Sequence, residues 1–270
     1  MTLEASDNVK ARIRDAGRLR LFLDYDGTLA DFAPTPEHVE PDPDVIALVS
    51  ELAHHRGIQP AVISGRRLDH VKKLLPVPEV LLAGTYGVEL RLPTGEEVDR
   101  IPYEEVRPVL AVIRPRWEAL IAERDGFFLE DKGWALAIHG RYAKAAEAEG
   151  VLEEAKSEAR ELLAEAPSGL FRILGGHKFL EVGPSLAHKG KTVAYVLKHH
   201  PWLGALPLYV GDDDKDEEAF SVIHAHGGLA IRVCERGCDT IADGRLGSPE
   251  DARRWLRGLV GDGLAERNGR

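Results

Sequence analysis

The sequence contains no long apolar run. A membrane-spanning helix needs roughly 18 or more consecutive residues that are mostly apolar and uncharged, and no segment of this chain meets that requirement. The segment 1–20 is charged throughout and lacks the apolar stretch of a signal peptide. We therefore predict a soluble, cytoplasmic protein that has no membrane partner.

Positive charge is also scarce. The chain has 35 Lys and Arg residues against 45 Asp and Glu residues, which gives a formal net charge of −10. Without a long Lys/Arg cluster it lacks the electrostatic footprint of a nucleic-acid-binding protein, so we expect no nucleic-acid partner. An acidic protein that handles an anionic substrate must gather positive charge locally, from a metal ion or from a few basic side chains in one cleft.

Cysteine is nearly absent from the chain. The two cysteines are Cys234 and Cys238, and no second Cys or His pair stands at the spacing of a zinc site. A metal-binding pair is therefore the weaker interpretation. We predict two reduced thiols with a structural role.

What the chain does contain is a regular alternation of short apolar segments and amphipathic ones. The N-terminal part has the pattern strand, helix, strand, helix, strand, and this pattern returns from Leu186 onward. It predicts an α/β fold with a doubly wound, Rossmann-like parallel sheet, in which ligands bind beyond the carboxyl ends of the strands. The expected strands are 20–24, 59–63, 80–83, 206–210 and 230–233, and the expected helices are 42–56, 68–75, 190–198 and 217–225.

The pattern changes in the middle of the chain, after an expected hairpin formed by 86–92 and 98–101. The order there is helix, two strands, helix, two strands. These elements are expected at 104–124, 127–130, 134–139, 143–166, 170–174 and 178–182. We predict an inserted α+β domain at 104–182, within a core domain made of 1–103 and 183–270.

The segment Asp24–Leu29, DYDGTL, follows the first expected strand of the core. Asp24 and Asp26 are two residues apart in a turn, so both carboxylates can face one cleft, where one can act as a nucleophile and the other can donate and accept protons. Gly27 permits a sharp turn, and Thr28 offers a hydroxyl and an N–H to a phosphate oxygen. An aspartate-rich turn without catalytic function is the alternative interpretation of the spacing alone.

Three further segments with polar side chains stand at strand ends or at a helix start. They are SGR at 64–66, Lys189, and GDD at 211–213. Together with DYDGTL, and in the same order along nearly the whole chain, they resemble the four signature segments of phosphatases of the haloacid dehalogenase superfamily. That resemblance implies a magnesium-dependent phosphatase that works through a covalent aspartyl-phosphate.

The resemblance also implies roles for individual residues. Asp24 would attack phosphorus, and Asp26 would protonate the departing sugar oxygen and later accept a proton from water. Mg²⁺ would bind Asp24, the backbone carbonyl of Asp26, and Asp212, an oxygen-rich set that suits this ion. The remaining phosphate oxygens would contact the side chains of Thr28, Ser64, Arg66 and Lys189. Behind them, Asp213 would support the site and Asp216 would orient Lys189 or a metal-bound water.

Finer features resemble trehalose-6-phosphate phosphatases within the superfamily. The matching segments are 24–29, 33–36, 86–89, 130–133, 137–141, 180–184 and 211–220. The inserted domain would then be a cap that closes over the sugar and excludes water. Carried over by position, the sugar contacts would be Glu130, Lys132, Arg141, His177, Lys178 and Glu181. A surface turn at 130–132 and a structural ion pair of Arg141 are the alternatives.

Three positions depart from the pattern of that family. His177 stands four residues before Glu181 where Lys is usual, Lys215 stands where Thr is usual, and Tyr86 stands where His is common. The leading substrate is a small sugar phosphate, trehalose 6-phosphate. Mannosyl- or glucosyl-3-phosphoglycerate, sucrose 6-phosphate and glucosylglycerol phosphate remain alternatives, as do a phosphosugar mutase and a non-catalytic sugar-phosphate sensor. The sequence does not predict the oligomeric state.

Overall fold

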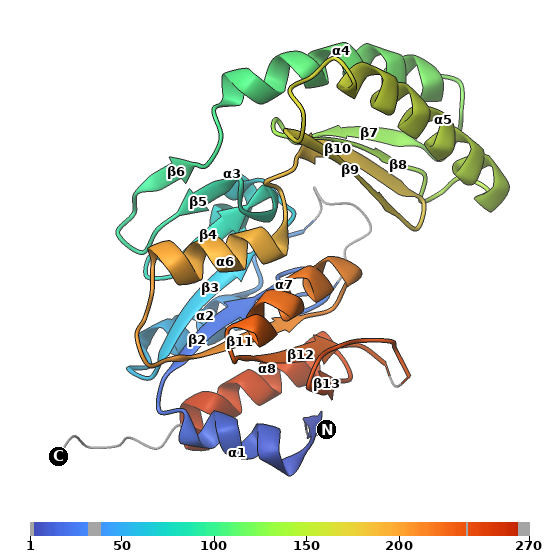
Figure 1. The fold of residues 1–270 in the computed structure, drawn as a ribbon. Helices are drawn as coiled ribbons and strands as arrows, with labels where there is room; N and C mark the ends of the chain where they lie inside the picture. Colours follow the sequence, from blue (N-terminus) through green and yellow to red (C-terminus); the bar gives the residue numbers. More distant parts are fainter. Residues whose placement is uncertain (1–2, 32–38, 236, 264–270) are drawn as a thin grey trace. The chain divides into compact units, whose positions relative to one another are not determined.

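The computed structural model describes residues 3–31, 39–235 and 237–263 (Figure 1). The chain forms two compact units: Met1–Val98 with His188–Arg270, and Asp99–Ala187. The second unit begins five residues before the predicted inserted domain at 104–182 and ends five residues after it. The segment 33–36, one of those that carry the family resemblance, lies outside the described residues.

The first unit is built on a sheet that is mostly parallel. Among the described residues it has nine strands in the order β1-β13-β12-β11-β2-β3-β4-β5-β6. The strands from β13 to β4 are parallel, whereas β1 and β5 pair with the ends of this run in antiparallel fashion. The predicted α/β fold class is therefore confirmed. The strands are β1 Glu4–Ala5, β2 Leu19–Leu23, β3 Ile58–Ile63, β4 Leu81–Gly84, β5 Glu89–Arg91, β6 Glu97–Asp99, β11 Leu206–Gly211, β12 Leu229–Val233 and β13 Gly244–Leu246.

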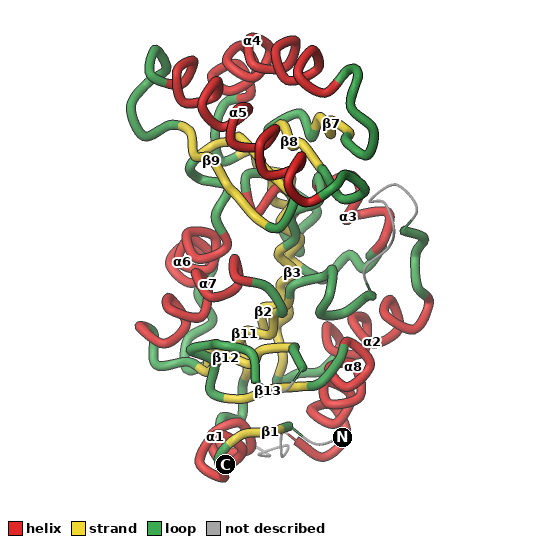
Figure 2. The backbone as a smooth tube through the Cα atoms, turned by 90° about the vertical axis from the view of Figure 1, so that its right-hand side faces the viewer, coloured by secondary structure: helices red, strands yellow, loops and turns green. Residues whose placement is uncertain are grey.

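Helices cover both faces of this sheet, with α6 and α7 on one side and α2 and α8 on the other (Figure 2). Leu21 and Leu23 pack into the cluster that holds α2 and α8, whereas Phe22 packs into the cluster that holds α6 and α7. A strand that is buried on both faces favours apolar side chains on both sides, which explains the apolar run at 21–23 in β2, although Arg20 of the same strand is also buried. The helices are α1 Asp7–Asp15, α2 Pro43–His54, α3 Leu68–Leu74, α6 Lys189–His199, α7 Asp214–Ala225 and α8 Pro249–Gly258, with a 3₁₀ turn at Thr85–Gly87 and a π-helical turn at Leu259–Gly263.

The second unit is a four-stranded antiparallel sheet, with the order β7-β8-β10-β9 among the described residues. Its helices α4 and α5 pack together on one face of the sheet, where the indole N–H of Trp117 donates to the carbonyl of Ala155 at 3.1 Å. Its elements are α4 Tyr103–Ile121, β7 Phe128–Asp131, β8 Leu136–His139, α5 Ala145–Leu163, β9 Phe171–Gly176 and β10 Phe179–Pro184. The order of elements in this unit agrees with the predicted helix, two strands, helix, two strands.

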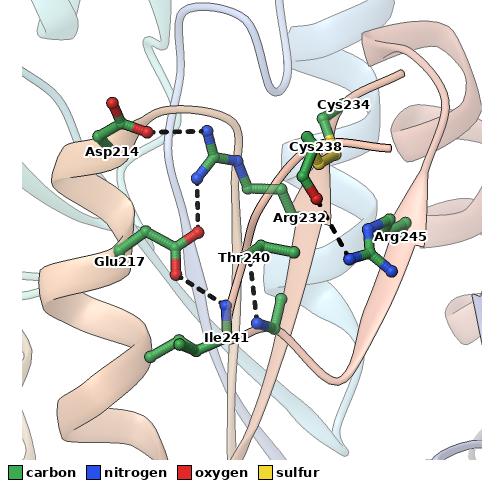
Figure 3. The surroundings of a disulfide bond; sticks show 9 residues. Asp214, Glu217, Arg232, Cys234, Cys238, Thr240, Ile241 and Arg245 are labelled. Carbon is green, nitrogen blue, oxygen red and sulfur yellow. Dashed lines mark hydrogen bonds and ion pairs between the residues drawn. A yellow bond between two sulfur atoms is a disulfide. The ribbon is translucent and has the colours of Figure 1, made fainter. Parts of the chain in front are cut away.

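The two cysteines are joined in a disulfide, Cys234–Cys238, in the loop that follows β12 (Figure 3). The prediction of two reduced thiols is therefore wrong. The carbonyl of Cys238 accepts a hydrogen bond from the guanidinium of Arg245 in β13 at 3.3 Å, so the loop is tied to the neighbouring strand. Spacing along the chain could not reveal this bond, because a disulfide needs two side chains that face each other.

Among the described residues, no helix is both long enough and apolar enough to cross a membrane.

Candidate active site

Three neighbouring strands of the first unit bring a predicted catalytic, a predicted phosphate-binding and a predicted metal-binding side chain to one edge of the sheet. Asp24 follows β2, Ser64 follows β3 and Asp212 follows β11, and β2 lies between the other two strands. All three strands are parallel, so their carboxyl ends meet. The backbone N–H of Asp24 still donates to the carbonyl of Val210 at 3.0 Å, which holds Asp24 beside the end of β11.

Lys189 is the buried cation of this edge. Its ammonium lies 2.8 Å from Asp24 Oδ1, 2.6 Å from Asp216 Oδ1 and 3.6 Å from Asp213 Oδ1, and its side chain is only 2% exposed. It is the first residue of α6, where the helix dipole disfavours a positive charge. Burial alone would lower the pKa of Lys189, but the carboxylates of Asp216 and Asp24 hold this pKa well above its usual value. The ammonium therefore stays charged.

Asp216 organises the loop that carries Asp212. Its Oδ1 accepts from Lys189 Nζ at 2.6 Å and from the hydroxyl of Tyr209 at 2.7 Å. Its Oδ2 accepts from the backbone N–H groups of Asp212 and Asp213, each at 3.0 Å. Burial, with added repulsion from neighbouring aspartates, raises the pKa of Asp216 to about 8 against the opposing effect of Lys189. With both of its oxygens used within the protein, Asp216 supports the site from behind.

The residues that could hold a cation are Asp24 and Asp212. Carboxylate oxygens of Asp24, Asp212 and Asp216 lie within 4.8 Å of one another, but the oxygens of Asp216 are engaged as described above. Burial raises the pKa of Asp24 well above its usual value and the pKa of Asp212 to about 6, and the nearby aspartates add to both shifts. When they are ionised, these carboxylates carry more negative charge than the ammonium of Lys189 balances. A divalent cation that prefers oxygen ligands fits this donor set.

The hydroxyl of Thr28 lies between the same two carboxylates, 3.4 Å from Asp24 Oδ2 and 3.2 Å from Asp212 Oδ1. Thr28 is fully buried. Its sequence-predicted contact is with phosphate, whereas in this structure its single O–H lies within hydrogen-bonding distance of both carboxylates and can donate to either. It can therefore fix the orientation of either candidate cation ligand.

The carboxylate of Asp26 accepts two hydrogen bonds from the guanidinium of Arg66. The Nε of Arg66 donates to Asp26 Oδ2 at 2.8 Å and its Nη2 donates to Asp26 Oδ1 at 2.6 Å. Arg66 is predicted from the sequence to contact phosphate, but its fork is here occupied by the carboxylate of Asp26. Gly27, with φ of 79°, makes the turn that leads the chain away from Asp26.

Ser64 is 1% exposed, and its hydroxyl accepts from the N–H of Arg66 at 3.1 Å. The 3₁₀ turn after β4 closes over this loop, because the N–H of Tyr86 donates to the carbonyl of Ser64 at 2.8 Å and the N–H of Thr85 donates to that of Arg66 at 2.7 Å. The loop that presents the Ser64 hydroxyl is thus held from both sides.

In the second unit, three of the predicted sugar contacts form one charged cluster. Lys132 Nζ lies 2.6 Å from Glu181 Oε2 and 3.9 Å from Glu130 Oε2. Glu181 is 1% exposed, and Glu130 also contacts His139 Nε2 at 2.9 Å. Glu130 and Glu181 both pair with Ala137, so their side chains leave the sheet on the same face. The cluster therefore forms a hydrogen-bonding surface of opposite charges that suits hydroxyl groups.

The other predicted sugar contacts are elsewhere in this unit. Lys178, with φ of 52°, donates from Nζ to the carbonyl of Ala143 at 2.6 Å. His177 and Lys178 line, together with residues of α5 such as Leu152, a cavity of about 380 Å³. Arg141 is exposed beyond the end of β8. The structure thus brings Glu130, Lys132 and Glu181 together. His177, Lys178 and Arg141 are not part of this cluster.

The sequence from residue 22 to residue 241 matches the model of the trehalose-phosphatase family. The chain belongs to this family. A probable trehalose-phosphate phosphatase of Sinorhizobium fredii is 33% identical over 259 residues, which cover 94% of this chain and 91% of the relative. Trehalose 6-phosphate phosphatase RA3 of Zea mays is 30% identical over 257 residues, which cover 89% of this chain and 69% of the relative.

Solved structures agree with the fold. The C-terminal domain of the trehalose-6-phosphate phosphatase of C. albicans superposes with a TM-score of 0.82 over 96% of this chain and 98% of that domain, at 20% identity. A protein related to trehalose-6-phosphate phosphatase superposes with a TM-score of 0.73 at 21% identity, over 90% of this chain and 96% of that one. The resemblance to the trehalose-phosphatase family inferred from the sequence is confirmed.

Sequence reasoning missed several residues that shape the site of this trehalose-phosphatase family member. The hydroxyl of Tyr209 donates to Asp216. The imidazole of His139 contacts the rings of Phe128 and Phe179 and hydrogen-bonds Glu130. Arg232 of β12 binds Glu217 and Asp214 in the first turn of α7, which fixes the start of that helix (Figure 3). The motif HGR at 139–141 offered a signal for His139, since the histidine faces the same side of the sheet as Glu130 and Glu181.

Proposed function

We propose that this chain is a magnesium-dependent phosphatase that hydrolyses trehalose 6-phosphate to trehalose and phosphate through an aspartyl-phosphate on Asp24. The observation that carries the proposal is the buried ion pair of Lys189 and Asp24, 2.8 Å apart, at the sheet edge where Asp212 and Ser64 also emerge. Membership of the trehalose-phosphatase family supports the substrate.

Asp24 is the nucleophile of this mechanism. A carboxylate needs no base to activate it once it is ionised, and the charged Lys189 together with a bound cation keeps it in that form. An oxygen of Asp24 forms a bond to phosphorus while the bond from phosphorus to the sugar oxygen breaks. Lys189 and the hydroxyl of Ser64 contact the phosphoryl oxygens, where negative charge accumulates in the transition state.

Asp26 moves the protons. It gives a proton to the sugar oxygen as that oxygen leaves, and it then accepts a proton from the water that hydrolyses the aspartyl-phosphate. In the structure the Arg66 fork binds both oxygens of Asp26, at 2.6 and 2.8 Å, so one oxygen has to leave this fork before it can carry the proton that Asp26 gives to the sugar oxygen. We assign Arg66 to positioning Asp26 in addition to its sequence-predicted contact with phosphate.

Asp24 and Asp212 would hold Mg²⁺, together with the backbone carbonyl of Asp26. The bound ion would offset the repulsion between the aspartates and the phosphate and would polarise the phosphoryl oxygens. In its absence these carboxylates bind protons more readily, in line with the raised pKa values of Asp24 and Asp212. Asp213 and Asp216 serve behind the ion, Asp216 by fixing Lys189 and the amides of the 212–213 loop.

We further propose that the second unit acts as a cap and supplies the sugar contacts. Glu130, Lys132 and Glu181 form a compact set of donors and acceptors whose types suit the hydroxyls of a disaccharide. His139 positions Glu130 by its contact at 2.9 Å. His177, Lys178 and Arg141 remain candidates for contacts of lower specificity.

The test is release of inorganic phosphate from a panel of esters in the presence of Mg²⁺. The panel contains trehalose 6-phosphate, mannosyl- and glucosyl-3-phosphoglycerate, sucrose 6-phosphate, glucosylglycerol phosphate and glucose 6-phosphate. The variants are Asp24→Asn and, as a matched control, Asp15→Asn at an exposed site on α1. Dominant turnover of trehalose 6-phosphate that is lost only in Asp24→Asn supports the proposal. Preference for another ester would contradict the substrate, and no release by the parent chain would contradict the activity.

A further inference from the structure

Tyr86 lies beside the candidate active site in a backbone conformation that side chains seldom adopt. Thr85 and Tyr86 have φ values of 47° and 54°, in the left-handed region. The surroundings hold this strained turn in place, because the N–H of Tyr86 donates to Ser64 and its carbonyl accepts from the hydroxyl of Thr192, both at 2.8 Å. Strain of this kind persists where neighbouring structure over-determines it, and such places cluster at functional sites.

The ring of Tyr86 lies against the loop that presents Ser64. A Cβ atom added to Gly65 would come within 2.6 Å of the ring's Cζ and 2.7 Å of its hydroxyl oxygen. Only glycine at position 65 leaves room for the ring, which is itself 5% exposed. The phenol group is therefore fixed at the backbone between Ser64 and Arg66.

The side chain of Lys215 contacts the hydroxyl of this ring. Its ammonium donates to the Tyr86 hydroxyl at 3.1 Å and lies 5.3 Å from the centroid of the ring. The hydrogen bond to the hydroxyl of a buried, fixed ring restricts the position of this ammonium.

The same ammonium faces the buried charges of the site. Lys215 Nζ lies 3.8 Å from Asp213 Oδ2, and Lys189 Nζ lies 3.6 Å from Asp213 Oδ1, so the carboxylate of Asp213 stands between two cations. The side chain of Lys189 is 2% exposed, whereas that of Lys215 is 24% exposed. Lys215 is thus the cation of this pair that an incoming anion can reach through solvent.

We propose that Lys215, positioned by Tyr86, is a substrate-binding residue that contacts the phosphate group of the ester. The inference rests on the proposed function. It adds a second positive charge next to Lys189, in a protein whose net charge of −10 would otherwise repel a phosphate ester. Lys215 is neither the nucleophile nor the residue that transfers protons. We therefore expect it to affect the binding of the substrate.

The test compares Lys215→Met, Tyr86→Phe and the double variant with Lys198→Met, a matched control at an exposed site on α6. Lys215→Met keeps the length of the side chain and removes its charge. We expect it to raise KM for the ester by about tenfold or more with kcat within about twofold, because one hydrogen bond to a charged group is lost. Tyr86→Phe should raise KM by roughly threefold, and the double variant should resemble Lys215→Met, since the two side chains act through one contact.

Inorganic phosphate as a competitive inhibitor provides the direct readout. Its inhibition constant should rise in Lys215→Met by the same factor as KM and stay unchanged in Lys198→Met. An unchanged inhibition constant, or a fall in kcat together with a lower melting temperature, would overturn the proposal and leave Lys215 a structural residue. Binding of phosphate can also be measured by calorimetry, so a chain that failed to hydrolyse trehalose 6-phosphate would disprove the proposed function and still test Lys215.

Discussion

The guanidinium of Arg66 donates two hydrogen bonds to the carboxylate of Asp26, from Nε to Oδ2 at 2.8 Å and from Nη2 to Oδ1 at 2.6 Å. The pair joins residues that are 40 positions apart, from the loops after β2 and β3, and both side chains are largely shielded, with 10% and 23% exposure. A bidentate pair fixes the plane of a carboxylate as well as its position. The group proposed to move protons is therefore set by a partner outside the DYDGTL segment.

Replacing Arg66 should impair the reaction most where proton transfer to the leaving group matters most. For Arg66→Ala we expect kcat/KM for trehalose 6-phosphate to fall roughly 100-fold, and for p-nitrophenyl phosphate by less than about tenfold, because that leaving group needs no proton. Arg56→Ala, at an exposed site, is the control. Equal losses on the two substrates would show that Arg66 acts on phosphate instead, which is its sequence-predicted contact.

We expect Asp216 to stabilise the fold as well as to support the site. Asp216→Asn places an amide group where Lys189, Tyr209 and two backbone N–H groups all donate, so the buried donors lose acceptors. Above about pH 8, where Asp216 is ionised and pairs with Lys189, we expect a loss of about 3–5 kcal/mol in the free energy of unfolding, as for other broken buried ion pairs. Urea denaturation measures it. Asp214→Asn in the same helical turn, where the side chain is 99% exposed, should leave stability nearly unchanged, and a similar loss in both variants would contradict this account.

The central strands and the order of the catalytic segments were predictable because their signals are local. Each of the three central strands ends in a buried, mostly apolar run, and a polar side chain follows it, namely Asp24 after β2, Ser64 after β3 and Asp212 after β11. Most of the elements that escaped prediction carry weak signals: β1 has two residues, β13 has three, and α1 buries only Val9 and Ile13. The helix α8 also escaped prediction, although Ser248 and Pro249 mark its start in the sequence. The start of α7 was predicted late, at 217, because the capping box of Asp213 and Asp216 draws charged residues into the helix.

Within the site, the sequence did not predict which side chains contact each other. Thr28 and Asp212 are 184 positions apart, and Tyr86 and Lys215 are 129 apart. Local patterns identify which side chains carry chemistry, but which of them meet depends on strand order and on turn geometry. The disulfide illustrates the same limit, because two cysteines four positions apart fit a reduced pair equally well until the loop is folded.

The metal-free protein should lose stability as pH rises. Burial and neighbouring aspartates raise the pKa of Asp212 from 3.8 to about 6 and that of Asp216 to about 8. Each group binds its proton more tightly in the native state than in the unfolded state, so its contribution is complete below pH 3.8 and is lost as pH rises through the raised value.

Melting temperatures in EDTA should therefore fall between pH 5 and pH 8, roughly the interval that these two groups span. Mg²⁺ binds the ionised carboxylates, so the stabilisation that it adds should grow over the same interval. Asp212→Asn should abolish that stabilisation, whereas Asp15→Asn on α1 should keep it. A stabilisation by Mg²⁺ that is independent of pH, or that survives in Asp212→Asn, would argue against the assigned ligands.

The second unit should matter for the sugar and not for the phosphate. Glu130→Gln keeps the size of the side chain but removes its negative charge, which faces Lys132 Nζ at 3.9 Å, and alters its hydrogen bond with His139 Nε2 at 2.9 Å. We expect KM for trehalose 6-phosphate to rise by roughly tenfold, because hydrogen bonds from sugar hydroxyls to a charged acceptor are weakened. The KM for p-nitrophenyl phosphate, which carries no sugar, should not change. Glu154→Gln, exposed on α5, is the matched control, and a parallel rise for both substrates would place the effect of Glu130 on folding or on phosphate rather than on the sugar.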